Sequence, residues 1–343
     1  MKGTSEYHSF NRGLISRLGL ARVDLKRTAL SAEVMTNWMP RVLGSMMLRP
    51  GLGYINTQSG LTRPIPFIFS NADTAKVDVH NASTAFTIGD VQLTRPAVTA
   101  ALTNGNLTTN FTGWTSVDPG TVNAWQAGGY AGLAGDGTAI SSLQQDVTVN
   151  EPNVEHGLRI VVQRGPLVVR VGSAANGTDY IADTVLGTGA HSLAFTPTGA
   201  LFSVKFFNQN TRLALLDSCT VEAAGAVNLT SPWATADLPM LRHDQSGDII
   251  FVACSGYRQR MIMRRSARSW SIQEYLTDDG PFRLENTSST TITPSGLTGN
   301  ITLTSSAVSS TGIFRSTHVG ALFSLTSTGQ TSRRKTTSAR TFE

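Results

Sequence analysis

The sequence has few charged residues, only two cysteines and no long apolar run. No window of about 18 uninterrupted apolar residues occurs, so we expect no membrane insertion. The first fifteen residues lack the apolar core of a secretory signal peptide. Cys219 and Cys254 both stand in apolar, strand-like stretches. We therefore expect two buried free thiols, with a disulfide between them as the alternative.

Recognisable catalytic motifs are also missing. The chain has no phosphate-binding glycine loop with a lysine, no His-Glu-x-x-His motif, no Cys-x-x-Cys pair and no Gly-x-Ser-x-Gly elbow. Asp278 and Asp279 precede Gly280 and Pro281, which predicts a turn and not the convergent acid pair of a glycoside hydrolase. We therefore predict that the chain is not an enzyme. A hydrolase that degrades cell wall or capsule is the least favoured alternative.

The residues that are abundant favour β-structure. Apolar residues make up 40% of the 343 positions, and glycine, threonine, serine and asparagine are frequent. This mixture is typical of many short strands joined by tight turns. The formal net charge of +5 comes mostly from residues 2–49, 258–268 and 333–340. Because the chain between these stretches is close to neutral, the sequence predicts no continuous basic face.

One helix is predicted near the start of the chain. Val23, Leu30, Val34 and Trp38 recur at spacings of seven and four, which makes an apolar stripe along a helix from residue 22 to about 38. Pro40 ends this helix. We assign residues 1–60 to an N-terminal segment with this amphipathic helix and the Arg-Pro-Gly turn at positions 49–51.

The remaining chain divides into β-segments. Residues 61–102 and 226–284 are predicted to form one discontinuous host β-domain. Residues 285–330 are a Ser/Thr-rich β-segment, and the basic residues 331–343 are expected to be a disordered tail.

A separate β-sandwich is predicted between the two host segments, over residues 103–225. Asn-Gly-Asn at positions 104–106, Gly113-Trp114 and the closing stretch 215–221 resemble the ends of jelly-roll carbohydrate-binding modules. That resemblance implies a core position for Trp114. Strands about ten residues apart with turn residues between them suit a sandwich. The predicted strands span residues 140–149, 156–163, 167–171, 191–196 and 201–208.

The host segments carry an ordered set of motifs. They are Phe-Asn-Arg-Gly-Leu-Ile-Ser at 10–16, Ala-Arg-Val-Asp-Leu at 21–25, Asn-Trp at 37–38, Arg-Pro-Gly at 49–51, Ile-Pro-Phe at 65–67, Thr-Arg-Pro at 94–96, Gln-Ser-Gly-Asp at 245–248 and Asp-Gly-Pro-Phe at 279–282. In this order they resemble the tail nozzle (tubular tail or stabilisation) proteins of short-tailed bacteriophages and prophages. Arg17 departs from the family, which commonly has proline there.

The resemblance implies a virion structural protein, made in the bacterial cytoplasm. Subunits would form a homo-oligomeric ring, sixfold by resemblance, below the head–tail connector, in contact with other tail proteins and around the path of the DNA. Family members are usually longer, which implies that this chain lacks a C-terminal portion. The alternative function is a carbohydrate-binding module that recognises the host surface; deletion of the sandwich is expected to separate the two.

Three sets of candidate site residues follow. Sugar binding needs exposed aromatic faces near loop tips, and the candidates are Trp125, Tyr130 and Tyr180. Jelly-roll modules often hold a structural Ca²⁺ on oxygen ligands near their paired ends, here Asn104 and Asp217; no other cofactor is expected. Contacts between subunits or with DNA in the channel are assigned to Arg258, Arg260, Arg264 and Arg265. Subunit salt bridges are favoured, because every neutralised phosphate would retain the DNA.

Overall fold

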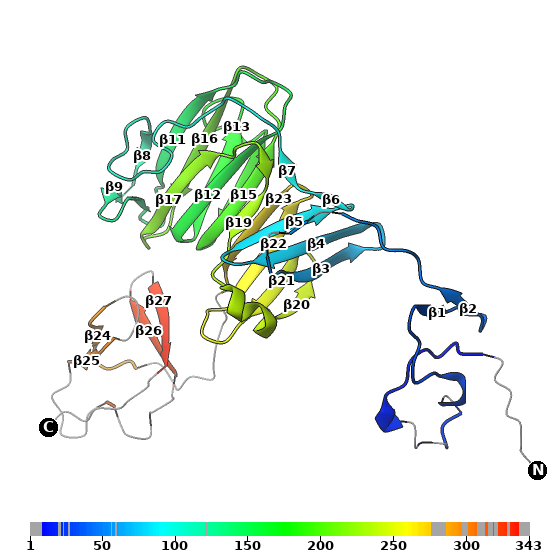
Figure 1. Cartoon of the computed structure of the whole chain (residues 1–343). Coiled ribbons are helices and arrows are strands. Elements are labelled where there is room, and N and C mark those ends of the chain that lie inside the picture. Colours follow the sequence, from blue (N-terminus) through cyan, green and yellow to red (C-terminus); the bar gives the residue numbers. More distant parts are fainter. Residues whose placement is uncertain are drawn as a thin grey trace, which may run out of the picture. The chain divides into compact units, whose positions relative to one another are not determined.

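The computed structural model describes residues 9–19, 22, 24–26, 28–55, 57–58, 60–120, 122–275, 286–296, 301–306, 313–314, 318, 322–327 and 330–335. The chain divides into two compact units, Met1–Asn56 and Thr57–Glu343. The second unit is built mainly from short antiparallel strands, in line with the predicted mainly β fold (Figure 1).

The first unit consists of turns and one small hairpin. Its elements are η1 (Arg17–Gly19), η2 (Thr28–Leu30), β1 (Trp38–Pro40) and β2 (Met46–Leu48). Strands β1 and β2 pair with each other, and an isolated bridge joins Leu14 to Ala32. Among the described residues, none before Ile65 is a buried apolar residue. This unit therefore has no apolar core of its own in the part of the chain that is described.

The helix predicted over residues 22–38 is wrong for the described residues of this stretch. They form the short 3₁₀ turn η2 and the start of β1, while Val23 lies outside the described residues. The physical reason is the absence of a packing partner: Val34 is 74% exposed and Trp38 is 47% exposed. Most of the stability of an amphipathic helix comes from burial of its apolar face, and here nothing described covers that face.

The second unit contains two host sheets that enclose one core. The first sheet has the order β19-β5-β4-β3, with β6 paired to β5. Its strands, with the neighbouring short strands, are β3 (Arg63–Ser70), β4 (Asp73–His80), β5 (Ser83–Ile88), β6 (Val91–Gln92), β7 (Thr94–Arg95), β18 (Gly225–Ala226) and β19 (Asn228–Thr230). The strands of the second are β20 (Arg242–Ser246), β21 (Ile249–Ala253), β22 (Arg260–Ser266) and β23 (Ser269–Glu274). Along the chain, the 3₁₀ helix η3 (Thr235–Met240) lies between β19 and β20.

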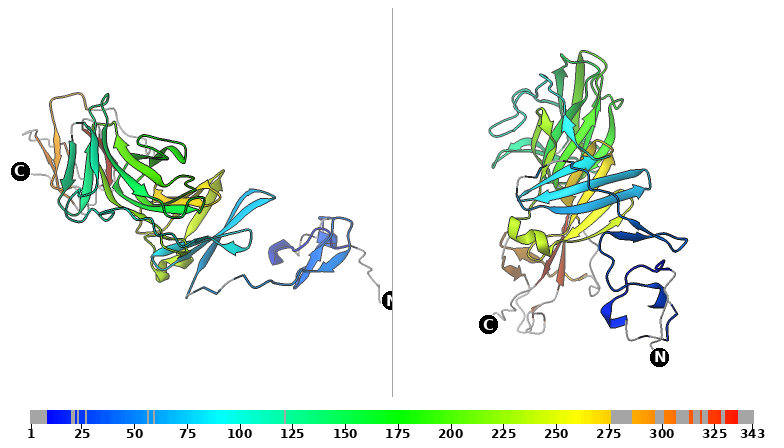
Figure 2. Two further views of the ribbon diagram at one scale, coloured as in Figure 1. Left: turned by 90° about the horizontal axis from the view of Figure 1, so that it is seen from above. Right: turned by 45° about the vertical axis from the view of Figure 1, so that its right-hand side comes forward.

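Residues that precede the sandwich in the sequence and residues that follow it both contribute to the host core. Trp270 of β23 is fully buried, stacks on Phe86 at 4.6 Å between ring centroids and meets Phe67 edge-on at 5.3 Å. Strand β19 pairs with β5, and β18 pairs with β7. In Figure 2 the cyan strands β3 to β5 cross over the yellow strands β20 to β23. The segments before and after the sandwich thus share one sheet and one core.

The sandwich is made of two five-stranded layers. Its strands are β8 (Thr115–Pro119), β9 (Val122–Gln126), β10 (Tyr130–Ala134), β11 (Ser141–Thr148), β12 (His156–Arg164), β13 (Leu167–Gly172), β14 (Ile181–Leu186), β15 (Gly189–Phe195), β16 (Leu201–Asn208) and β17 (Ala214–Val221). One layer has the order β15-β12-β17-β10-β9 and the other β14-β13-β16-β11-β8.

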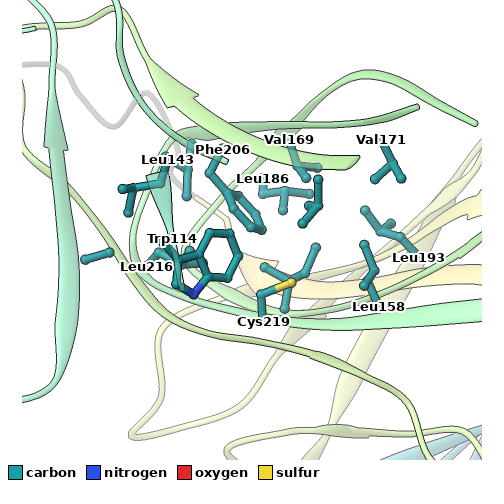
Figure 3. Packing of buried hydrophobic residues seen from close by; sticks show 14 of the residues in the cluster. Trp114, Leu143, Leu158, Val169, Val171, Leu186, Leu193, Phe206, Leu216 and Cys219 are labelled. Atoms are coloured by element: carbon teal, nitrogen blue, oxygen red, sulfur yellow. The ribbon is translucent and has the colours of Figure 1, made fainter. Parts of the chain in front are cut away.

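Alternating apolar side chains fill the space between the layers. Figure 3 shows Leu143, Val169 and Phe206 from one layer facing Leu158 and Leu216 from the other. Trp114 is buried in this core, as the resemblance implied. Both cysteines are buried and unpaired, as expected, with Cys219 in the sandwich core and Cys254 in the host core.

The sandwich and the host share a continuous sheet. Edge strand β15 pairs with β23, so the host order β20-β21-β22-β23 continues into the sandwich layer as one nine-stranded sheet (Figures 1 and 2). At this junction Gly189 has φ +147°, and a Cβ there would lie 2.1 Å from the carbonyl oxygen of Ile272. Only glycine permits this close approach of the two strands.

Several predicted strands match the structure closely, and others were missed. The prediction for 201–208 coincides with β16, and those for 140–149, 156–163, 167–171 and 191–196 differ from β11, β12, β13 and β15 by one or two residues at an end. Strands β8, β9, β10 and β14 were not predicted. Polar residues in β8, β9 and β14 and a glycine in β10 hide the alternation.

The C-terminal described residues form two hairpins. Strand β24 (Ile292–Pro294) pairs with β25 (Leu303–Ser305), and β26 (Leu322–Ser327) pairs with β27 (Gln330–Lys335). The disordered tail predicted from residue 331 is therefore wrong for 331–335, which complete a ladder with an apolar strand. Residues 336–343 and the predicted turn at Asp278 and Asp279 lie outside the described residues.

Candidate functional site

Two of the three predicted sugar-binding aromatics lie on one hairpin. Strands β9 and β10 form an edge of the sandwich, and Ala131 of β10 pairs with Trp125 while Tyr130 pairs with Gln126. The indole N–H of Trp125 donates to the carbonyl oxygen of Leu107 at 2.8 Å, and the side chain is partly exposed. Trp125 is therefore held in place with part of its ring open to solvent.

Tyr180 lies elsewhere. It precedes β14, the edge strand at the opposite end of the other layer, and its ring stacks on Phe195 at 5.9 Å. Its hydroxyl group accepts from the backbone N–H of Thr198 at 3.0 Å. Tyr180 thus packs against the sandwich core, and the structure does not bring it together with Trp125 and Tyr130.

The two predicted calcium ligands are engaged in local hydrogen bonds. The side-chain amide of Asn104 donates to the backbone oxygen of Asn110 at 2.8 Å, and its own backbone oxygen accepts from the Trp114 indole at 3.2 Å. Asp217 accepts from the hydroxyl of Ser218 at 3.1 Å. Within the described ranges, no group of three or more His, Cys, Asp or Glu side chains is arranged to hold a metal ion. The calcium site stays a prediction.

The first two arginines of the predicted cluster share one acidic partner. Arg258 and Arg260 lie 3.1 and 3.5 Å from the carboxylate of Glu274 in β23. Arg260 is mostly buried, and burial lowers its pKa although the Glu274 charge opposes that effect. The two positive charges therefore share the single negative charge of Glu274.

The other two arginines point to different surroundings. Arg264 lies 2.6 Å from Asp73 and 2.7 Å from Asp248, and its guanidinium covers the ring of Phe69 at 4.6 Å. The next residue, Arg265, donates to the backbone oxygen of Val185 in the sandwich at 2.9 Å. The predicted basic cluster is therefore divided among three sets of contacts inside the chain.

A buried ionic cluster at the junction of host and sandwich was not predicted. Arg95 at the end of β7 is 4% exposed and donates to Glu222 at 2.7 Å, Glu155 at 2.8 Å and Ser192 at 2.8 Å. Arg268 donates to Glu155 at 2.9 Å. Removing one member of such a cluster leaves an uncompensated buried charge, which is strongly destabilising. Its role is to fix the sandwich against the host.

This junction cluster borders an open cavity of about 370 Å³. Arg159 lines it, lies 2.9 Å from Glu222 and donates to the backbone oxygen of Asn228. Burial lowers the pKa of Arg159, and the nearby Glu222 partly offsets this. Spacing along the chain does not indicate this cluster, because Arg95 and Glu222 are 127 residues apart.

The first unit presents an apolar surface. Several of its large apolar side chains are at least 65% exposed, and two of them, Val42 and Leu43, lie at the turn of the β1–β2 hairpin. We call this set the apolar surface of the first unit: Leu14, Leu18, Val34, Val42, Leu43 and Leu52. These side chains leave apolar area in contact with water.

Among the described residues, no helix is long and apolar enough to span a membrane. No protein-family model matches the chain, and no curated protein matches its sequence.

Proposed function

We propose that the chain is a nozzle-type tail subunit of a short-tailed bacteriophage or prophage, a virion structural protein made in the bacterial cytoplasm. The observation that carries the proposal is the completion of one β-domain by segments on either side of the sandwich. Trp270 packs on Phe67 and Phe86, and β19 pairs with β5. The ordered motifs of residues 63–95 and 225–274 thereby belong to one folded body, as the resemblance to nozzle proteins requires.

The proposed mechanism is geometric. Identical subunits would form a closed ring through heterologous contacts below the head–tail connector, and the DNA would pass through the centre. The apolar surface of the first unit supports assembly, because burying it removes apolar area from water at roughly 25 cal/mol per Å². The described residues of the first unit form no apolar core of their own. Its partner would be a neighbouring subunit or the connector.

The sandwich is proposed to be a jelly roll. When β10 to β17 are counted from one to eight, one layer contains the order 1-8-3-6 and the other the order 2-7-4-5. Two interlocked Greek keys in eight strands give this order. Strands β8 and β9 add one further strand to each layer.

The assembly proposal is tested by sedimentation velocity and electron microscopy of the purified full chain, alone and with its connector. We expect rings, or a ring bound to the connector. Val42→Glu with Leu43→Glu should abolish assembly, because two charges would be buried in the interface. The control is Val91→Glu, which changes an exposed apolar residue in the second unit (69% exposed, against 93% for Val42 and 97% for Leu43) and should leave assembly intact. A chain that stays monomeric and does not bind the connector would refute the proposal.

A second candidate function is carbohydrate binding by the sandwich, used in recognition of the host surface. The observation that favours it is the fixed, partly exposed indole of Trp125 on the β9–β10 hairpin, where the strand register places Tyr130 on the opposite face of the sheet. Aromatic faces of this kind can stack on a sugar ring.

Deletion of residues 103–225 cannot separate the two functions cleanly, because it removes β15, the pairing partner of β23. Trp125→Ala is the sharper variant. If adsorption to cells falls while particles still assemble, the sandwich binds a glycan. Unchanged adsorption would leave the sandwich with a structural role only.

A further inference from the structure

Strand β16 carries a buried lysine on the face that points away from the sandwich core. Lys205 is 4% exposed, while its neighbours Val204 and Phe206 point into the core. Lysine is rarely buried unless its ammonium group is paired. The Nζ atom of Lys205 lies 2.7 Å from Oδ2 of Asp118 and 2.7 Å from Oδ1 of Asn176. An amine, a carboxylate and a side-chain amide therefore meet at one point.

The loop that presents Asn176 is held in a fixed conformation. Asn176 has φ +61°, a left-handed conformation in which asparagine is enriched. Both carboxylate oxygens of Asp179 accept from the backbone N–H of Ser173, at 3.0 and 3.2 Å. Gly172 and Gly177 approach so closely that a Cβ on Gly172 would lie 2.4 Å from the backbone of Gly177. The loop thus keeps the Asn176 amide on Lys205.

Two hydrogen bonds with Ser142 hold Asp118 in position. Its carboxylate accepts from the hydroxyl of Ser142 at 2.8 Å, and its backbone N–H donates to the same hydroxyl oxygen at 3.1 Å. Strand β8 therefore places the carboxylate between Ser142 and Lys205. Asp118 belongs to β8, Asn176 to the loop between β13 and β14, and Lys205 to β16. A bond between Lys205 and Asn176 would therefore join elements that are far apart in the sequence.

We propose that Lys205 and Asn176 form an intramolecular isopeptide bond, with Asp118 as the proton acceptor. Asp118 takes one proton from the Lys205 ammonium group. The neutral Nζ then attacks Cγ of Asn176, which lies one C=O bond beyond the oxygen already in contact. A second Nζ proton passes to Nδ2, the Cγ–Nδ2 bond breaks and ammonia leaves. The third proton remains on the new amide, and Asp118 gives its proton to the released ammonia.

The reaction needs no cofactor and happens once in each molecule. The hydrogen bond from Lys205 is the main cause of a lowered pKa for Asp118, which makes its carboxylate a weaker proton acceptor. Fixed contact between reacting groups compensates, because effective molarities of about 10⁵ to 10⁸ M are known for well-oriented groups. A slow reaction still reaches completion when the product does not revert.

Mass spectrometry of the purified full chain tests the proposal. We expect an intact mass lower than that of the sequence by one ammonia. Digestion with trypsin together with Asp-N protease, which cleaves before Asp179 and Asp183, should give a linked pair of peptides, 171–178 and 183–212, joined through Asn176 and Lys205, with no cleavage after Lys205. Asn176 is followed by Gly177, and a succinimide at this pair would also lose ammonia. That product stays within one peptide and is cleaved by hydroxylamine, whereas the isopeptide bond resists hydroxylamine.

Two variants complete the test. Lys205→Arg keeps the positive charge without a reactive amine, and Asp118→Asn removes the proton acceptor. Both should retain the full ammonia mass and give unlinked peptides. Recovery of wild-type Lys205 in a free, cleavable peptide after prolonged incubation at neutral pH would overturn the proposal. The result does not depend on whether the chain assembles into a ring.

Discussion

Acidification should weaken the junction of host and sandwich through His191. This residue of β15 is fully buried and pairs with Ser271 of β23. Its Nε2 lies 3.0 Å from the carbonyl oxygen of Gly187, which can only accept, so Nε2 carries the proton. Its Nδ1 lies 2.9 Å from the hydroxyl of Ser271 and accepts from it. Arg265 in turn donates to the Ser271 oxygen at 3.3 Å.

These surroundings favour the neutral imidazole. Burial is the main reason that the pKa of His191 falls from 6.5 to about 3; the hydrogen bond to Gly187 opposes this and the Arg265 charge adds to it. Between these two pH values the unfolded chain binds a proton that the folded chain does not. The free energy of unfolding therefore falls as the pH drops through this window, by about 1.4 kcal/mol per pH unit. The loss is about 2 kcal/mol at pH 5 and about 5 kcal/mol at most.

The assay is urea unfolding at pH 7.5 and pH 5, for the wild type and His191→Gln. The variant cannot titrate at this position, and carboxylates elsewhere contribute equally to both proteins. We expect the wild type to lose about 2 kcal/mol more than the variant between the two pH values. Equal losses in the two proteins would refute the reasoning, because His191 would then have the same pKa folded and unfolded.

Three further variants test the packing of the second unit by urea unfolding. Gln245→Ala removes two side-chain hydrogen bonds to the backbone of β3, at 2.9 and 3.0 Å, and should cost about 1–2 kcal/mol. A stability equal to the wild type would contradict this. Gly189→Ala should cost about 3 kcal/mol of stability, because its Cβ would lie 2.1 Å from the Ile272 oxygen and its φ is positive. The control Gly199→Ala, with open space around it, should be nearly neutral. Equal effects of the two variants would show that the clash at Gly189 is relieved. Glu222→Gln should cost about 3 kcal/mol and increase proteolysis at the junction, because Arg95 loses a buried charge partner. An unchanged rate of proteolysis would argue against a fixing role.

The strands that the sequence predicts best are those with clean alternation. Leu201 to Asn208 alternates inward Phe202, Val204 and Phe206 with outward residues, and the prediction matches β16. The N-terminal helix was predicted from an equally regular spacing, yet Val34 and Trp38 remain exposed. Periodicity shows which face could be buried but not whether a partner is present to bury it.

The site residues show the same limit. Trp125 lies at an edge of the sandwich, as a sugar-binding residue would, but Tyr180 packs against the core. The junction cluster and the contact of Lys205 with Asp118, 87 residues away, depend on pairings between distant strands. Spacing along the chain carries no information about such contacts, so they could be found only from the three-dimensional structure.

The nine-stranded sheet has a mechanical consequence. Where an inserted domain hangs on two flexible linkers, a force on it mainly swings it about the attachment. Here β15 and β23 are hydrogen-bonded side by side, and the entering and leaving strands β7 and β18 are paired as well. A force on the sandwich therefore acts on several hydrogen-bonded strand pairs at once. The sandwich then behaves as a stiff arm, and a displacement at its far end is transmitted to the host domain.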